Sequence, residues 1–93
     1  MTTLPAGDVL RVAREHGATR VHVFGSWARG EQLPGSDLDL LVDLEVGRSL
    51  LDLVAIKQDL EDLLHCDVDV VTERSLSPYL RERVLSEAVL LSA

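Results

Sequence analysis

Hydrophobic and polar residues alternate in three short stretches of the chain, and each stretch predicts a β-strand. These stretches are residues 20–24, 38–42 and 67–71. Successive side chains of a strand point to opposite faces, so alternate residues share one face. In the second stretch, three apolar residues share a face and are expected to point into the core: Leu38, Leu40 and Val42.

Helical spacing of apolar residues predicts three longer helices, over 4–16, 49–65 and 79–91. Ser49, with Asp52 three residues later, resembles a capping box at the start of the second of them. The third helix ends in a group of apolar residues, which would serve either as a partner surface or as core: Leu85, Val89, Leu90 and Leu91. For Leu85 we expect core packing. Residues 1–3 are expected to fray.

The predicted order is helix, strand, short helical turn, strand, helix, strand, helix. The short turn at Pro34-Gly35 favours an antiparallel first pair of strands, whereas the long helix lets the third strand join in either sense. A small mixed sheet covered by helices on one face follows. The fold class is therefore α/β in the broad sense, an α+β two-layer sandwich that forms a single domain over 1–93.

Composition narrows the classes of function. The chain has 93 residues, a formal net charge of −7 and a pI near 4.7, so its surface repels nucleic acid. A single cysteine, Cys66, excludes an internal disulfide and a cysteine-based zinc site. No basic and apolar leader or membrane-length apolar run is present in the sequence. We expect a soluble cytoplasmic domain without direct contact to nucleic acid or membrane.

The stretch FGSWARGEQLPGSDLDLLVD carries the candidate chemistry. Gly25-Ser26 ends the first strand, and ten residues later Asp37-Leu38-Asp39 opens the second. Glycine lets the backbone approach a ligand closely, and a serine hydroxyl can bind a phosphate oxygen or cap the helical turn. Asp37 and Asp39 have the same parity, with Cα atoms roughly 6.5–7 Å apart, and carboxylates suit hard cations. Phosphate and metal together indicate phosphoryl or nucleotidyl transfer.

A third carboxylate is expected from the strand at 67–71. Asp69 is the preferred candidate because it lies mid-strand between two valines, an unusual position for a charge without a ligand. Asp67 has the same parity and is the competing candidate. Three aspartates at one site would repel each other unless divalent cations bind, and two-metal sites stabilise both the entering and the leaving oxygen of a displacement.

Gly-Ser, ten residues and Asp-x-Asp together resemble the nucleotidyltransferase superfamily of DNA polymerase β and the aminoglycoside nucleotidyltransferases. The whole stretch is similar to the minimal nucleotidyltransferase (MNT) proteins of bacteria and archaea. That resemblance implies the nucleotidyltransferase fold, two Mg²⁺ ions held by Asp37, Asp39 and Asp69, and transfer of AMP from ATP with release of pyrophosphate. Gly25 and Ser26 would bind the nucleotide, and Asp69 would help deprotonate the attacking hydroxyl.

Two neighbours of the Gly-Ser pair have competing interpretations. Arg29 could neutralise triphosphate charge, or it could pair structurally with Glu31 or a motif aspartate. Trp27 is expected to be a packing or partner residue more than a platform for a base.

The resemblance also implies a partner, a HEPN-domain ribonuclease toxin whose tyrosine would be adenylylated, which would make the chain an antitoxin. One alternative is neutralisation of the toxin by binding alone, and another is the catalytic subunit of a small-molecule nucleotidyltransferase. In each case the acceptor must be held by another copy, by a partner or by the acceptor itself, so a homo- or hetero-oligomer is expected.

Overall fold

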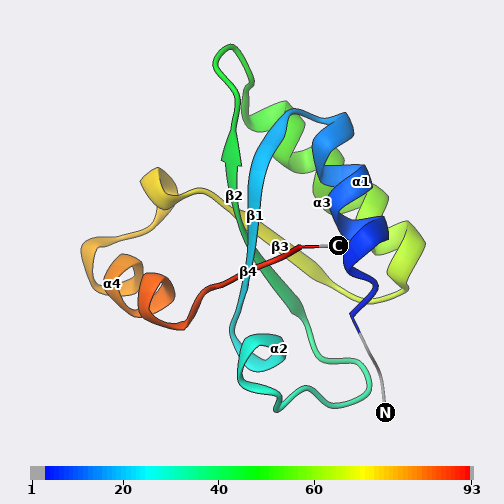
Figure 1. The fold of residues 1–93 in the computed structure, drawn as a ribbon, viewed down its shortest axis with the longest axis vertical. Coiled ribbons are helices and arrows are strands. Elements are labelled where there is room, and N and C mark those ends of the chain that lie inside the picture. Colours follow the sequence, from blue (N-terminus) through cyan, green and yellow to red (C-terminus); the bar gives the residue numbers. More distant parts are fainter. Residues whose placement is uncertain (1–3, 93) are drawn as a thin grey trace.

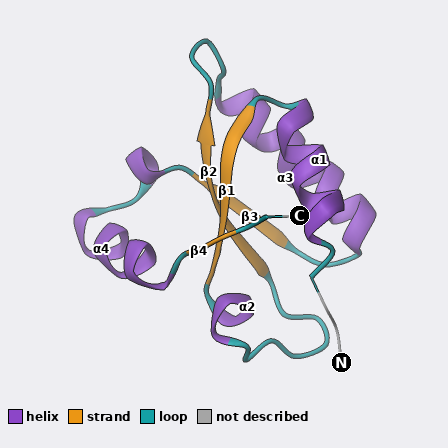
Figure 2. Cartoon of the chain, in the orientation of Figure 1, coloured by secondary structure: helices purple, strands orange, loops and turns teal. Residues whose placement is uncertain are grey.

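The computed structural model describes residues 4–92, so the expectation that residues 1–3 fray lies outside the described residues. The elements follow one another around a small sheet (Figures 1 and 2). In chain order they are α1 (Ala6–Glu15), β1 (Ala18–Phe24), α2 (Ser26–Arg29), β2 (Leu38–Leu44), α3 (Leu50–Leu64), β3 (Val68–Val71), the 3₁₀ turn η1 (Glu73–Ser75), α4 (Pro78–Glu87) and β4 (Val89–Leu90).

The sheet is mixed, with strand order β3-β2-β1-β4. β1 and β2 are antiparallel, as the short Pro34-Gly35 turn predicts. β3 runs parallel to β2, which resolves the direction that the sequence left open. This parallel pairing brings the amino-terminal ends of β2 and β3 together, and Asp39 and Asp69 lie at those ends.

The main core lies between the sheet and the two helices α1 and α3, which pack side by side on one face (Figure 1). Three strand residues predicted to face this core are almost fully buried: Leu38, Leu40 and Val42. The helices contribute Val9, Leu10, Val12 and Ala13 from α1 and Leu53, Ile56 and Leu60 from α3. The predicted α+β architecture is confirmed.

The start of α3 is fixed by the capping box that its sequence predicts. The Ser49 N–H donates to Asp52 Oδ2 at 2.8 Å, and the Leu51 N–H donates to Ser49 Oγ at 3.2 Å. Within residues 4–92, no helix combines the length and the apolar character needed to cross a bilayer.

The carboxyl-terminal segment differs from the prediction. The last helix, expected over 79–91, ends at Glu87, and Val89–Leu90 form a fourth strand that pairs with His22 and Val23 of β1. α4 also lies on the side of the sheet away from α1 and α3 (Figure 1).

Core packing of Leu85 was the wrong expectation, because this side chain is 46% exposed while its neighbour Val84 is only 6% exposed. Adjacent residues of a helix point in directions about 100° apart. Burial of Val84 therefore turns Leu85 toward solvent.

Candidate active site

Asp39 and Asp69 lie directly opposite each other on neighbouring parallel strands. The register pairs Asp39 of β2 with Asp69 of β3, and adjacent strands are about 4.8 Å apart. Leu38 and Leu40 point into the core, so Asp39 between them points to the other face of the sheet. The structure thus brings together the two carboxylates that the sequence placed on separate strands.

The environment of Asp39 disfavours its charge. Its pKa is raised from 3.8 to about 6, chiefly by partial burial, then by the negative charges of Asp69 and Asp37 and by a hydrogen bond between the Asp39 and Asp69 side chains. The positive charge of Arg29 opposes this rise. A carboxyl whose neighbours are carboxyls is a site where a cation would restore the balance of charge.

Asp37 is near this pair but is not aligned with it. It precedes β2, is exposed, and acts on Asp39 through its charge. Across residues 4–92, no three acidic, histidine or cysteine side chains already converge at the spacing of a complete metal-ligand set. The donor set nevertheless fits Mg²⁺ in chemistry, because two carboxylates lie side by side and a third is within electrostatic reach.

The register distinguishes the two candidates for the third carboxylate. Asp67 lies just before β3, and its carbonyl oxygen accepts a hydrogen bond from the Leu38 N–H at 2.9 Å. Asp69 is the residue opposite Asp39. Asp69 is also exposed, so the burial argument that favoured it from sequence does not hold, and its position in the sheet supports it instead.

Gly25 allows the backbone to pass directly over Asp39. Its φ of 72° and ψ of −151° lie in a region that only glycine adopts readily. A Cβ at this position would overlap Asp39 Oδ2 and would lie 3.3 Å from Asp39 Cγ. The Gly25 carbonyl oxygen accepts from the N–H groups of Ala28 and Arg29, both at 3.1 Å, and so starts the four-residue helix α2 at Ser26.

Arg29 pairs with two glutamates. Its Nη1 lies 3.0 Å from Glu87 of α4, and its Nε lies 3.2 Å from Glu31. Pairing with Glu31 was one of the two interpretations, and the effect of Arg29 on the pKa of Asp39 places its charge near the motif as well. Glu87 is a residue that sequence reasoning missed, because 58 positions separate it from Arg29.

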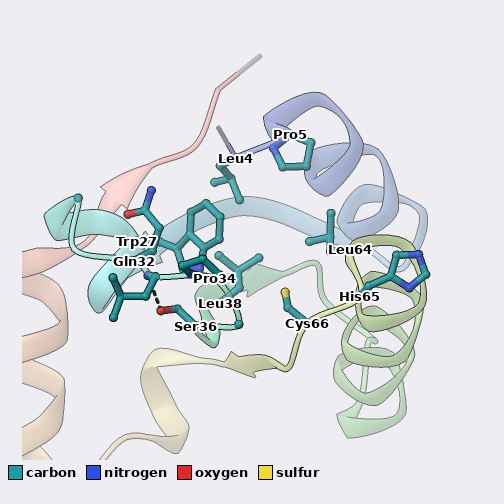
Figure 3. A pocket seen from close by; sticks show the side chains of 13 residues that line it. Leu4, Pro5, Trp27, Gln32, Pro34, Ser36, Leu38, Leu64, His65 and Cys66 are labelled. Atoms are coloured by element: carbon teal, nitrogen blue, oxygen red, sulfur yellow. Dashed lines mark hydrogen bonds between the residues drawn. The ribbon is translucent and has the colours of Figure 1, made fainter. Parts of the chain in front are cut away.

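Trp27 packs against the core and lines a pocket of about 570 Å³ (Figure 3). Other residues that line this pocket include Pro34, Leu64, His65 and Cys66. The pocket reaches Leu38, which faces the core, and not the carboxylates. Trp27 therefore has the packing position expected for it, and the acidic residues lie on a separate, open surface.

Comparison with known protein families shows to which family the chain belongs. The family model of the nucleotidyltransferase domain matches residues 9–91. The chain belongs to this family. A nucleotidyltransferase of Methanocaldococcus jannaschii, provisionally named protein adenylyltransferase MJ0435, is 47% identical over 81 residues, which are 87% of each chain. The protein adenylyltransferase MntA of Thermococcus cleftensis is 42% identical over 73 residues, 78% of this chain and 74% of its own.

Solved structures of nucleotidyltransferases match the fold. One, described provisionally as a minimal nucleotidyltransferase, is 56% identical with a TM-score of 0.79 and covers 90% of this chain and 86% of its own. Another, a toxin-antitoxin complex with AMP-PNP, is 26% identical with a TM-score of 0.83. The match covers 97% of this chain and 74% of the other chain. The predicted nucleotidyltransferase fold and the resemblance to minimal nucleotidyltransferases are confirmed.

Proposed function

We propose that this nucleotidyltransferase moves AMP from ATP to a hydroxyl of a partner protein, a tyrosine of a HEPN-domain toxin, and thereby acts as an antitoxin. The observation that carries the proposal is the pairing of Asp39 with Asp69 beside the Gly25 turn. Transfer of AMP to a protein is supported by the relatives, which are named protein adenylyltransferases. The toxin-antitoxin neighbour with AMP-PNP supports a toxin partner and ATP as the nucleotide.

Each site residue has a separate role in the proposed reaction. Gly25 and Ser26 receive the triphosphate, because the glycine turn lies directly against Asp39 and would bring a bound phosphate next to the carboxylates. Arg29 contributes positive charge to the phosphates. Asp69 accepts the proton of the attacking hydroxyl, and attack at the α-phosphorus breaks the bond to pyrophosphate. Two Mg²⁺ ions held by Asp37, Asp39 and Asp69 would stabilise charge on the entering and leaving oxygens.

The open position of the acidic residues favours a macromolecular acceptor over a small one. Asp37 and Asp69 are both exposed, and the pocket beside Trp27 does not contain them. Small molecules are usually held in concave sites that bury most of their surface. The exposed carboxylates instead leave room for a tyrosine presented by another protein.

Labelled ATP tests the proposal. We expect the chain, Mg²⁺ and a HEPN-domain toxin encoded by a neighbouring gene, if one is present, to give label on the toxin from α-labelled ATP and none from γ-labelled ATP. Asp39→Asn should reduce labelling to background, and Asp62→Asn, which changes an exposed acid of α3, should not. Label from γ-labelled ATP would instead mean phosphoryl transfer.

A second candidate function is neutralisation by binding alone, and the exposed apolar side chains of α4 favour it: Tyr79, Leu80 and Leu85. Such a surface fits a protein partner. A growth assay with the toxin separates the two functions. Catalytic neutralisation should be lost with Asp39→Asn, whereas neutralisation by sequestration should survive that change.

A further inference from the structure

β3 is the strand that carries Asp69, and it is an edge strand of four residues. It is hydrogen-bonded to a neighbouring strand on one side only, and Asp39 on that neighbour repels Asp69. If the pairing of β3 with β2 shifted by one residue, a valine would take the position of Asp69 opposite Asp39. Something beyond the strand pairing must therefore fix β3 in place.

Lys57 and Glu61 of α3 bind the outer edge of β3 at Val68. Lys57 Nζ donates to the Val68 carbonyl oxygen at 2.7 Å, and the Val68 N–H donates to Glu61 Oε2 at 3.0 Å. The two side chains also join each other, with Lys57 Nζ 2.9 Å from Glu61 Oε2. Both outward backbone groups of Val68 are thus satisfied by one ion pair, which we name the Val68 clamp.

The clamp acts next to the site without belonging to it. Val68 directly precedes Asp69, and its own side chain is fully buried in the core. Holding its backbone from the outer edge therefore fixes the position and rotation of the next residue. The hydrogen bond with Glu61 raises the pKa of Lys57 most, and the charges of Asp69 and Asp67 raise it further. The ammonium group is thus close enough to offset part of the repulsion between the acidic residues.

We propose that Lys57 and Glu61 are positioning residues for adenylyl transfer, which hold Asp69 opposite Asp39 by fixing the backbone of Val68. This role rests on the proposed function of Asp69. Charge-assisted hydrogen bonds to backbone groups are stronger than neutral ones, so the clamp holds a short strand well. Replacing a residue that orients a catalytic group without touching the substrate typically lowers activity by about 10- to 100-fold.

The test compares Lys57→Met with Arg11→Met in the full chain. Lys57→Met keeps the apolar stem and removes the charge, and Arg11→Met removes a matched (i, i+4) ion pair with Glu15 that is exposed on α1. In Lys57→Met we expect the amide protons of Val68 and Asp69 to exchange about tenfold faster. Cross-strand proton contacts between Asp39 and Asp69, measured by NMR, should weaken. Arg11→Met should change neither.

Kinetics give the second readout. With Lys57→Met we expect kcat for transfer to fall about 10- to 100-fold while the KM for ATP stays within about twofold. Lys57→Arg should restore most of kcat, because a guanidinium can bridge the same carboxylate and carbonyl oxygens. Glu61→Gln keeps an acceptor for the Val68 N–H and should have a smaller effect.

The outcomes separate the clamp from the proposed function. Unchanged exchange at Val68 and Asp69 in Lys57→Met would overturn the clamp, whether or not the wild type transfers AMP. Faster exchange with unchanged kcat would overturn its role in positioning and leave the proposed function intact. If the wild type transfers no label, the proposed function fails, and the exchange and NMR contacts still decide whether the clamp holds β3.

Discussion

The Cα of Gly25 lies so close to the Asp39 carboxylate that no side chain fits between them. Asp39 belongs to β2, Gly25 directly follows β1, and the two strands pair antiparallel with Phe24 opposite Asp39. The Gly-Ser end and the acidic end of the motif are therefore in direct contact, although thirteen residues (26–38) lie between Gly25 and Asp39 along the chain. A phosphate group at the glycine turn would lie next to the carboxylates.

We therefore expect Gly25→Ala to reduce transfer by at least about tenfold, because the new Cβ displaces Asp39 and the positive φ is strained, at about 1–3 kcal/mol. Gly30→Ala is the matched control. Gly30 has the same φ of 72°, but a Cβ there would meet nothing within 4 Å. Both variants should lose some stability in a urea titration, and only Gly25→Ala should lose activity. Equal activities would contradict a role for this contact.

Asp39→Asn should stabilise the protein in the absence of nucleotide at neutral pH. The folded pKa of Asp39 is raised to about 6, so its ionised form is disfavoured in the native state. This penalty is absent below about pH 4, grows between about pH 4 and pH 6, and is fully present above pH 6. The pKa difference sets an upper bound of about 3 kcal/mol. Because solvent screens this part-exposed group, we expect about 1 kcal/mol, or about 5 °C in Tm.

Thermal melts of wild type and Asp39→Asn across this pH range check the sign. The two Tm values should converge at about pH 4, separate between pH 4 and pH 6 with the variant higher, and keep a constant difference above pH 6. Asp62→Asn should track the wild type throughout. A gap that widens toward acid would mean that the ionised Asp39 stabilises the fold.

Arg29 and Glu87 give a prediction about the role of their ion pair. If Arg29 serves the triphosphate, Arg29→Gln should raise the KM for ATP about tenfold. Glu87→Gln frees the guanidinium from one of its two partners and should leave KM within about twofold. An ion pair this exposed contributes little to stability. An identical rise of KM in both variants would show that the pair acts only by joining α2 to α4.

Val84 and Leu85 test the position of α4. Val84→Ala should lower the free energy of unfolding by about 1–2 kcal/mol, because the side chain is buried at 6% exposure. Leu85→Ala removes more carbon, yet it should cost less than about 0.5 kcal/mol, since Leu85 is 46% exposed. Urea denaturation of both variants provides the comparison. A larger loss for Leu85→Ala would restore the core packing expected from the sequence.

The sequence predicted what depends on local patterns. Alternation in the second strand predicted the inward positions of Leu38 and Leu40, and therefore the outward position of Asp39. Ser49 and Asp52 predicted the start of α3. These features need only the period of a strand or the chemistry of a helix cap, which a short stretch of sequence contains.

Features that depend on distant contacts were not predictable in the same way. Val89 and Leu90 continue an apolar run that suits a helix, and they become a strand only by pairing with β1. The mid-strand position of Asp69 predicted a burial that the structure does not show, and its pairing with Asp39 depends on the direction of β3, which the sequence left open. The pairing of Arg29 with Glu87 likewise depends on where α4 lies.

The clamp at Val68 has a practical consequence for handling this protein, because Lys57 is the only lysine in the chain. Reagents that acylate amines, including common fluorescent dyes, crosslinkers and coupling chemistries for sensor surfaces, therefore have one side-chain target. Modification there removes the ammonium group that holds β3. Tags for binding studies are better attached through the amino terminus at low pH, because thiol reagents would also meet Cys66, two residues before Val68.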